Sequence, residues 1–200
     1  MPFIFFDIDY TLIDTDKLRS RLSDAFQQTL NITAQQYKDV ISNYTSALAS
    51  STDFNPDEFI SFLAPKYDFP IADLEKVYWH NPQFYQESLY PEVLRVLKRM
   101  KGEYNMGIFS EGFIKYQTAK LKESGILNFF DPKNIYIFRR KLLPENLANL
   151  PAGSLVIDDD PVNVKALLNL PQVVPVWINR KNASTHPQAR TITSLLALLD

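Results

Sequence analysis

The chain has 200 residues, which is the length of one domain, or of one domain with an insertion. Its 21 basic and 23 acidic side chains give a net charge of −2, which argues against the generally basic surface of a nucleic-acid-binding protein. The absence of cysteine excludes disulfides, a thiol nucleophile and cysteine-based zinc sites, and the two histidines disfavour a histidine-rich metal site. No segment has the roughly 18 apolar residues of a membrane span and no signal peptide is recognisable, so we expect a soluble, cytoplasmic protein.

The first predicted element is a strand from Phe3 to Ile8. Its residues are apolar at consecutive positions, which is typical of a strand that is covered on both faces. The pattern then changes, because from about Asp16 to Leu89 the apolar residues recur at helical spacing and no strand pattern is visible. We therefore predict an all-helical insert over residues 15–89.

Strands and helices alternate regularly in the remainder of the chain. The patterns predict strands at 105–109, 135–138, 154–157 and 173–178, and helices at 93–100, 115–124, 162–168 and 192–199. This alternation predicts an α/β fold with a Rossmann-like, mostly parallel sheet formed by residues 1–14 and 90–200. Ligands of such sheets bind beyond the carboxyl ends of the strands.

Two acidic clusters follow predicted strands. Asp7 and Asp9 come at the end of the first strand, and Asp158, Asp159 and Asp160 follow the strand at 154–157. If both strands are central in one parallel sheet, these carboxylates meet at one edge, where they repel one another and raise one another's pKa. A cation among them would relieve that repulsion, and donors that are all oxygen suit Mg²⁺. The alternative is that the acids are turn residues and helix caps.

The segment Asp7-Ile8-Asp9-Tyr10-Thr11-Leu12, after its apolar strand, resembles the first motif of the haloacid dehalogenase-like superfamily, Asp-x-Asp-x-Thr. Three further positions resemble the other motifs of that family. They are Ser110 at a predicted strand end, Lys141 as the basic residue, and Asp158-Asp159 with Asn163 as the final acidic motif. The resemblance covers residues 2–14 and about 90–179, and it implies that residues 15–89 are a helical cap over the site.

The resemblance implies a Mg²⁺-dependent phosphatase that acts on a small phosphomonoester. Asp7 would attack phosphorus and form an aspartyl-phosphate, and Asp9 would act as general acid and then as general base. Magnesium would be held by Asp7, Asp158 and Asp159 together with the main-chain carbonyl of Asp9, without the sequence deciding which of Asp158 and Asp159 contacts it directly.

The phosphoryl group would be bound by residues at the ends of the strands. We expect this role for Thr11, Ser110, Glu111, Gly112 and Lys141. Ser110 could instead cap the next helix and Thr11 could be a turn residue. Arg139 competes with Lys141 for the basic role, because strand alternation would place the two on one face.

Other activities of the family fit the sequence less well. Members that hydrolyse carbon–halogen bonds have one aspartate in the first motif, so Asp9 favours phosphoryl transfer. A phosphomutase and a catalytically silent binding protein on this fold remain as alternatives. We expect a small phosphorylated metabolite as partner, and no nucleic acid, membrane or protein partner.

Overall fold

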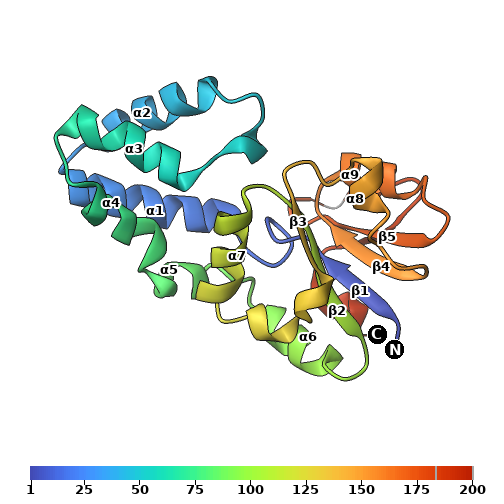
Figure 1. The fold of residues 1–200 in the computed structure, drawn as a ribbon. Coiled ribbons are helices and arrows are strands. Elements are labelled where there is room, and N and C mark those ends of the chain that lie inside the picture. Colours follow the sequence, from blue (N-terminus) through green and yellow to red (C-terminus); the bar gives the residue numbers. More distant parts are fainter. Residues whose placement is uncertain (183, 200) are drawn as a thin grey trace.

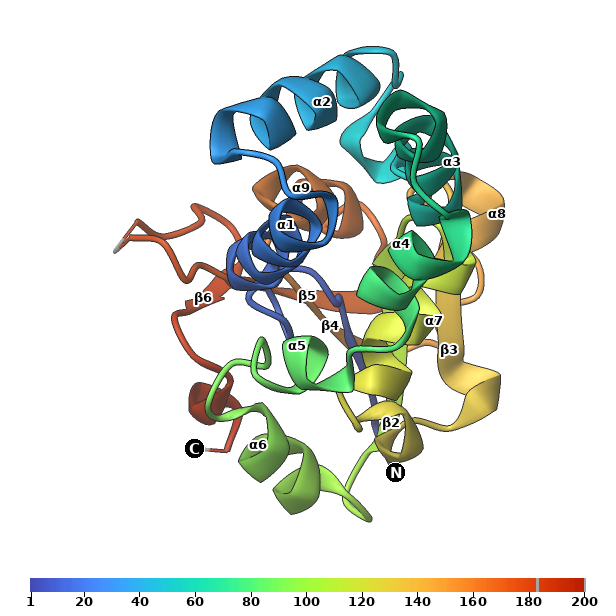
Figure 2. The same cartoon turned by 90° about the vertical axis from the view of Figure 1, so that its left-hand side faces the viewer.

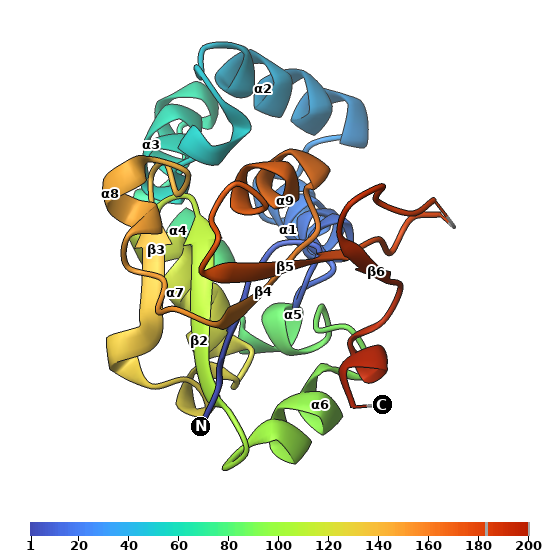
Figure 3. The ribbon, with the colours of Figure 1, turned by 90° about the vertical axis from the view of Figure 1, so that its right-hand side faces the viewer.

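A six-stranded sheet, with every neighbouring pair parallel, forms the centre of the protein in the computed structural model, which describes residues 1–182 and 184–199 (Figure 1). The strand order is β3-β2-β1-β4-β5-β6, and Figure 3 shows β3 and β2 at the left and β6 at the right. The strands are β1 (Phe3–Phe6), β2 (Asn105–Glu111), β3 (Ile135–Phe138), β4 (Ser154–Asp158), β5 (Val173–Ile178) and β6 (Arg190–Ile192). The prediction of an α/β fold with a parallel sheet is confirmed.

Strand β1 lies in the middle of the sheet, between β2 and β4. Its side chains alternate between two apolar clusters, with Ile4 and Phe6 on one face and Phe5 on the other, and all three are fully buried. This double burial explains why the strand is apolar at consecutive positions. The chain continues to β2 and β3 on one side of β1 and to β4 and β5 on the other, which makes the end of β1 a switch point where ligands bind in such sheets.

Helices cover both faces of the sheet. Helices α6 (Val93–Met100) and α7 (Ile114–Glu123) contribute Val96 and Leu121 to the cluster that contains Ile4. On the opposite face, α9 (Pro161–Leu167) contributes Leu167 to the cluster that contains Phe5, and α8 (Pro144–Leu147) packs against it. Helix α8 is a single turn, and it is the only helix that the structure describes between Lys141 and β4.

The segment between β1 and α6 contains helices and no strand, as predicted for the insert. Its helices are α1 (Thr15–Leu30), α2 (Ala34–Ser46), α3 (Pro56–Tyr67), α4 (Ile71–Trp79) and α5 (Pro82–Gln86). An aromatic cluster holds the first four together, with Phe26 of α1 in contact with rings from α2, α3 and α4. Figures 1 and 2 show these helices grouped beyond the end of the sheet at which β1 leads into α1.

The C-terminal segment differs from its prediction. Instead of a helix over 192–199, the chain forms strand β6 and a 3-10 turn from Leu195 to Leu198. Ile192 pairs with Ile178 at the edge of the sheet, and the Ser194 side chain caps the short turn. The apolar spacing is compatible with either arrangement, and the pairing with β5 decides between them. In the described part of the chain, none of the helices has the length and apolar character that crossing a membrane requires.

Candidate active site

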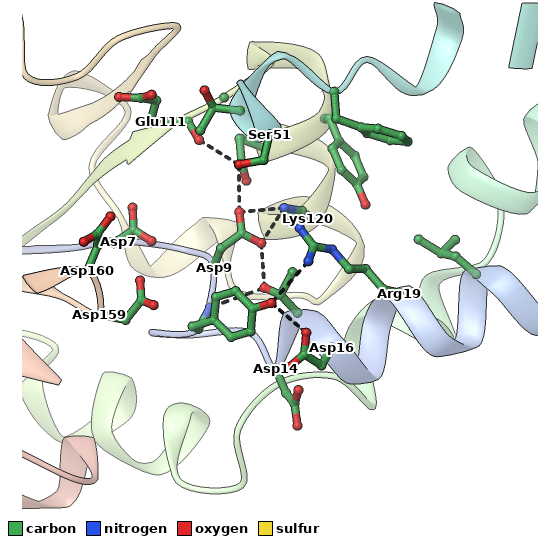
Figure 4. Close-up of a pocket in the computed structure, with 18 of the residues that line it drawn as sticks. Asp7, Asp9, Asp14, Asp16, Arg19, Ser51, Glu111, Lys120, Asp159 and Asp160 are labelled. Carbon is green, nitrogen blue, oxygen red and sulfur yellow. Dashed lines mark hydrogen bonds and ion pairs between the residues drawn. The ribbon is translucent and has the colours of Figure 1, made fainter. Parts of the chain in front are cut away.

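A cavity of about 1540 Å³ lies between the carboxyl ends of the central strands and the helical insert. Side chains from both parts line it, and they include Asp7, Asp9, Lys120, Lys141 and Asp159 from the sheet side and Tyr37, Phe54 and Tyr78 from the insert. Figure 4 shows the carboxylates of Asp7, Asp159 and Asp160 on one side of Asp9, and Lys120 on the other. The cavity is large enough for a small metabolite and lies where ligands of parallel sheets bind.

Asp7 is positioned by the pairing of the two central strands. Its N–H donates to the carbonyl of Ile157 at 2.9 Å, which continues the ladder between β1 and β4 and brings Asp7 beside Asp158. The Nζ atom of Lys141 lies 2.8 Å from Asp7 Oδ1 and 2.6 Å from Asp158 Oδ2. The structure thus brings together the two acidic clusters that the sequence predicted, with a buried lysine between them.

The carboxylates around Lys141 outnumber the single positive charge of its ammonium. Burial raises the pKa of Asp7 to about 7; Lys141 acts against this shift, and Asp158 adds to it. Burial and the charge of Asp7 raise the pKa of Asp159 to about 8. The two carboxylates beside Lys141 hold the pKa of its ammonium above the ordinary value, although burial acts in the opposite direction. Three carboxylates around one ammonium leave an excess of negative charge that a cation would relieve.

Asp158 and Asp159 differ in their contacts. The Oδ1 atom of Asp158 accepts hydrogen bonds from the Asp160 N–H at 3.0 Å and from Asn163 Nδ2 at 3.1 Å, while its Oδ2 accepts from Lys141. Asp159 lines the cavity and forms no ion pair with any of the described residues. Of the pair, Asp159 is therefore the one with oxygens available to a ligand.

Few side chains at this edge of the sheet are available as ligands for a magnesium ion. Within residues 1–182 and 184–199, no group of three or more histidine, cysteine, aspartate or glutamate side chains is arranged to hold a metal. The available donors are the carboxylates of Asp7 and Asp159, to which the main-chain carbonyl of Asp9 can be added. These donors are all oxygen, as Mg²⁺ requires, and the remaining positions of that ion are commonly filled by water or a phosphate group. The donor set is thus compatible with Mg²⁺.

Asp9 faces a different set of partners. Its carboxylate accepts hydrogen bonds from Thr15 Oγ1 at 2.6 Å and Gln117 Nε2 at 2.9 Å. Lys120 Nζ lies 2.7 and 2.8 Å from its two oxygens. Although burial acts to raise it, the pKa of Asp9 is lowered to about 2, chiefly by the charge and hydrogen bonds of Lys120.

The sequence analysis did not identify Thr15, Gln117 and Lys120 as site residues. Gln117 and Lys120 are three positions apart on the helix that follows the Ser110 motif, so they lie on one face. That spacing is the only signal in the sequence, and nothing in the pattern of an ordinary amphipathic helix distinguishes it.

Two predicted phosphate-binding hydroxyls are buried without a partner. The Oγ1 atom of Thr11 and the Oγ atom of Ser110 make no hydrogen bond to any described residue. Ser110 lies near the end of β2, opposite Ile137 of β3. Buried hydroxyls normally have a partner. Neither Ser110 nor Thr11 lines the cavity, but Glu111, which follows Ser110, does, so the unsatisfied Ser110 hydroxyl is one residue from the cavity wall.

Glu111 and Gly112 have other contacts than the predicted one with phosphate. The Gly112 N–H donates to the carbonyl of Phe138 at 2.8 Å, so it is not free for a phosphoryl oxygen. Glu111 Oε2 accepts a hydrogen bond from the backbone N–H of Lys141 at 2.8 Å, and a carboxylate repels a phosphate. These contacts make the two residues supports of the loop that carries Lys141. Both also line the cavity, so their role in phosphate binding stays a prediction.

Arg139 does not share a face with Lys141. Strand β3 ends at Phe138, and the alternation expected for a strand stops there. Arg139 and Arg140 both form ion pairs with Asp53 of the insert. Lys141 is therefore the residue of this basic run that contacts Asp7.

A family model and solved structures both relate this chain to haloacid dehalogenase-like hydrolases. The model of a family described as haloacid dehalogenase-like hydrolase matches residues 1–170. No curated protein matches the chain. Among solved structures, a protein from Burkholderia xenovorans described as a haloacid dehalogenase-like hydrolase is 19% identical, with a TM-score of 0.74, and the match covers 99% of this chain and 95% of that one.

Two other similar structures are a phosphatase and a magnesium-bound protein. The haloacid dehalogenase-type phosphatase from Thermococcus onnurineus is 22% identical, with a TM-score of 0.68 and coverage of 99% and 96%. YfnB from Bacillus subtilis, whose structure is bound to magnesium, is 19% identical, with a TM-score of 0.64 and coverage of 98% and 96%. Dehalogenases are also among the matches. At these identities the similarity shows the fold.

Proposed function

Because the chain belongs to the haloacid dehalogenase-like hydrolases, we propose that it is the phosphatase type of this family, a Mg²⁺-dependent enzyme that hydrolyses a small phosphomonoester through an aspartyl-phosphate. The proposal depends on one observation above all: a second carboxylate, Asp9, lines the same cavity as Asp7. Phosphoryl transfer needs a proton donor and acceptor beside the nucleophile, whereas members that hydrolyse carbon–halogen bonds have one aspartate in the first motif.

Asp7 is the proposed nucleophile. Its backbone is fixed by the ladder to Ile157, and Lys141 contacts one carboxylate oxygen at 2.8 Å. The other oxygen would attack phosphorus, the bond from phosphorus to the leaving oxygen would break, and the phosphoryl group would remain on Asp7. Lys141 also compensates part of the negative charge that gathers as the phosphoryl group approaches, because its ammonium is a buried point charge.

Asp9 is the proposed proton-transfer group. In the first step it would pass a proton from the phosphomonoester monoanion to the leaving oxygen, and in the second it would take a proton from the water that attacks the phosphorus of the aspartyl-phosphate. The low pKa of Asp9 suits the second step, since a general base has to be ionised. Ser110 would donate its unsatisfied hydroxyl to a phosphoryl oxygen.

The proposed ligands of Mg²⁺ are Asp7, Asp159 and the carbonyl of Asp9. When bound, the ion supplies positive charge that offsets the repulsion between the Asp7 carboxylate and an anionic phosphoryl group. Asp158 would act through hydrogen bonds, since its oxygens are occupied by Lys141, Asn163 and the Asp160 N–H. YfnB of Bacillus subtilis, bound to magnesium, supports this assignment by similarity of fold.

We propose a small phosphorylated metabolite as substrate. The cavity is roofed by the helical insert, which we interpret as a cap, and two of its residues tie that insert to the sheet side. Asp53 pairs with Arg139 and Arg140, and Asp57 pairs with Lys115 of α7 at 2.6 Å. A cavity roofed by the insert in this way favours a small substrate over a folded protein or a duplex nucleic acid.

The test is hydrolysis of p-nitrophenyl phosphate with Mg²⁺ and with excess chelator, next to chloride release from 2-chloropropionate. We expect phosphatase activity that needs Mg²⁺, and no chloride release. Asp7→Asn should lower phosphatase turnover by on the order of 10⁴-fold or more while the protein remains folded. Chloride release by the wild-type protein, or turnover by Asp7→Asn close to that of the wild type, would overturn the proposal.

A further inference from the structure

Helix α7 directs two side chains at the carboxylate of Asp9. Lys120 reaches both oxygens, at 2.7 and 2.8 Å, and Gln117 donates to one of them at 2.9 Å. On the far side, Thr15 at the start of α1 donates to the other oxygen at 2.6 Å. Figure 4 shows Asp9 enclosed between Lys120 and the first turn of α1. The carboxylate is therefore held from two elements that come from different parts of the chain.

The α7 side of this arrangement is buried while the Asp9 side chain is 25% exposed, which distinguishes it from an ordinary surface ion pair. Lys120 is 3% exposed and Gln117 is 4% exposed. A buried ammonium is costly without a counter-charge, and Asp9 is the only carboxylate with which Lys120 forms an ion pair in the described part of the chain. Such a lysine has little freedom to turn elsewhere, so it constrains Asp9 more strictly than a solvated partner would.

The backbone after β2 is shaped to accommodate Gln117. Gly112 has a φ of +142°, and a Cβ atom placed on it would lie 2.7 Å from Gln117 Nε2. The same amide group also donates to the carbonyl of Glu111 at 3.0 Å. A glycine at this position therefore leaves the space in which Gln117 connects the end of β2 to Asp9.

We propose that Lys120, assisted by Gln117, is a positioning residue that holds the Asp9 carboxylate in place for the hydrolysis of the aspartyl-phosphate. The inference rests on the function proposed above. In that step a water oxygen forms a bond to phosphorus and its proton passes to Asp9. The bond between phosphorus and the Asp7 oxygen breaks, and its electron pair stays on the Asp7 carboxylate. The step requires an oxygen of Asp9 at a fixed place beside the phosphoryl group.

The experiment uses p-nitrophenyl phosphate, because its leaving group departs without needing a proton. Formation of the aspartyl-phosphate should then be little affected in Lys120→Met, while its hydrolysis becomes slower by about 10- to 100-fold. Rapid mixing should show a burst of about one p-nitrophenolate per active site followed by a slow steady state, and acid quenching should trap phosphorylated protein. Lys120→Arg should restore part of the steady-state rate.

Lys115→Met is the matched control. Lys115 lies on the same helix and also forms an ion pair, but with Asp57 of the insert rather than with Asp9. Its replacement should give no burst and no trapped intermediate. Gln117→Met is a second variant, which keeps Lys120 and should accumulate less intermediate than Lys120→Met; it carries the test if Lys120→Met does not fold.

The outcomes separate this inference from the proposed function. If wild-type protein shows no Mg²⁺-dependent phosphatase activity, the proposed function itself fails. If the wild type is active and Lys120→Met retains its steady-state rate, the positioning role is wrong. It is also wrong if the variant loses burst and steady state in equal proportion, because a loss of folded protein acts on both steps alike.

Discussion

The two sides of the cavity treat a buried carboxylate in opposite ways. On one side, Lys141 is shared between Asp7 and Asp158, and the pKa of Asp7 rises to about 7. On the other side, Asp9 is the one carboxylate among the described residues that pairs with Lys120, and the pKa of Asp9 falls to about 2. The two aspartates are separated by one residue, so their position in the sequence does not cause the difference. Burial acts to raise both pKa values. At Asp9 the charge and hydrogen bonds of Lys120, with Thr15 and Gln117, outweigh it, whereas at Asp7 the shared Lys141 does not, and Asp158 adds to the rise.

This difference corresponds to the proposed division of labour. The Lys141 side keeps an excess of negative charge that a divalent cation can neutralise, and it holds the proposed nucleophile. On the other side, the charges of Lys120 and Asp9 cancel. The pairing keeps the Asp9 carboxylate, the proposed base, ionised and directed at Lys120 rather than at the metal. A chain with one lysine for each carboxylate on both sides would have less need of a cation.

The largest expected effect comes from removing the shared lysine. Lys141→Met leaves Asp7 and Asp158 buried without their counter-charge, and breaking such a buried pair costs about 3–5 kcal/mol of stability. The free energy of unfolding from urea titration at pH 7.5 measures it. We expect Mg²⁺ to restore part of the loss, because the ion supplies charge at the same place. A variant as stable as the wild type would show that Lys141 does not compensate these carboxylates.

The second prediction sets Asp7→Asn against Asp9→Asn. The folded pKa of Asp9, about 2, is below the ordinary value of 3.8, so its contribution to stability is present above pH 3.8 and is lost as the pH falls through 2. Asp9→Asn should thus lower the free energy of unfolding at pH 8 by about 2 kcal/mol.

Asp7→Asn should act in the opposite direction in metal-free protein. The folded pKa of Asp7, about 7, is above 3.8, so its cost to stability develops between pH 3.8 and 7 and is complete above 7. Removing that charge should raise the free energy of unfolding at pH 8 by about 1–3 kcal/mol, because Lys141 still pairs with Asp158. Thermal unfolding of both variants with a chelator present compares them, and shifts of the same sign would contradict the contrast between the two sides.

The third prediction concerns Mg²⁺ affinity. The raised pKa values of Asp7 and Asp159, about 7 and 8, mean that metal-free protein holds protons there at pH 6 and that binding must displace them. The dissociation constant should therefore fall by about tenfold or more between pH 6 and pH 7, and should become independent of pH only above about pH 9, one unit beyond the higher of the two pKa values. Calorimetric titration in buffers of different ionisation enthalpy measures both the affinity and the protons released. If the affinity for Mg²⁺ does not change between pH 6 and pH 8, Asp7 and Asp159 are not the ligands.

The site residues at the strand ends are easier to predict from the sequence than those on helix α7. Asp7 and the Asp158–Asp159 pair are recognisable because strand ends of a parallel sheet converge, so two motifs far apart in the chain can be placed together. Lys120 and Gln117 belong to a helix whose packing angle decides where its side chains reach, and a periodic pattern does not contain that angle. The hydrogen bonds of Glu111 and Gly112 are not visible in the sequence for a related reason, since they depend on how the loop after β3 turns back.

The smallest effect is expected from the ion pairs that tie the insert to each side. Asp53 binds the two arginines that precede Lys141, and Asp57 binds Lys115 on the helix of Lys120. Asp53→Asn and Asp57→Asn should each raise KM by less than about tenfold with little change in kcat, since partly exposed pairs contribute modestly. Asp53→Asn should have the larger effect, because its carboxylate is less exposed, at 17% against 38%, and has two cationic partners. Steady-state kinetics at low and high salt measures this. Salt should weaken the ion pairs of the wild-type protein, so that its KM rises toward the KM of the variants. If either variant changes kcat more than KM, the ion pairs of the insert do more than hold it over the cavity. They would then influence the nearby catalytic-side lysine, Lys141 in the case of Asp53 and Lys120 in the case of Asp57.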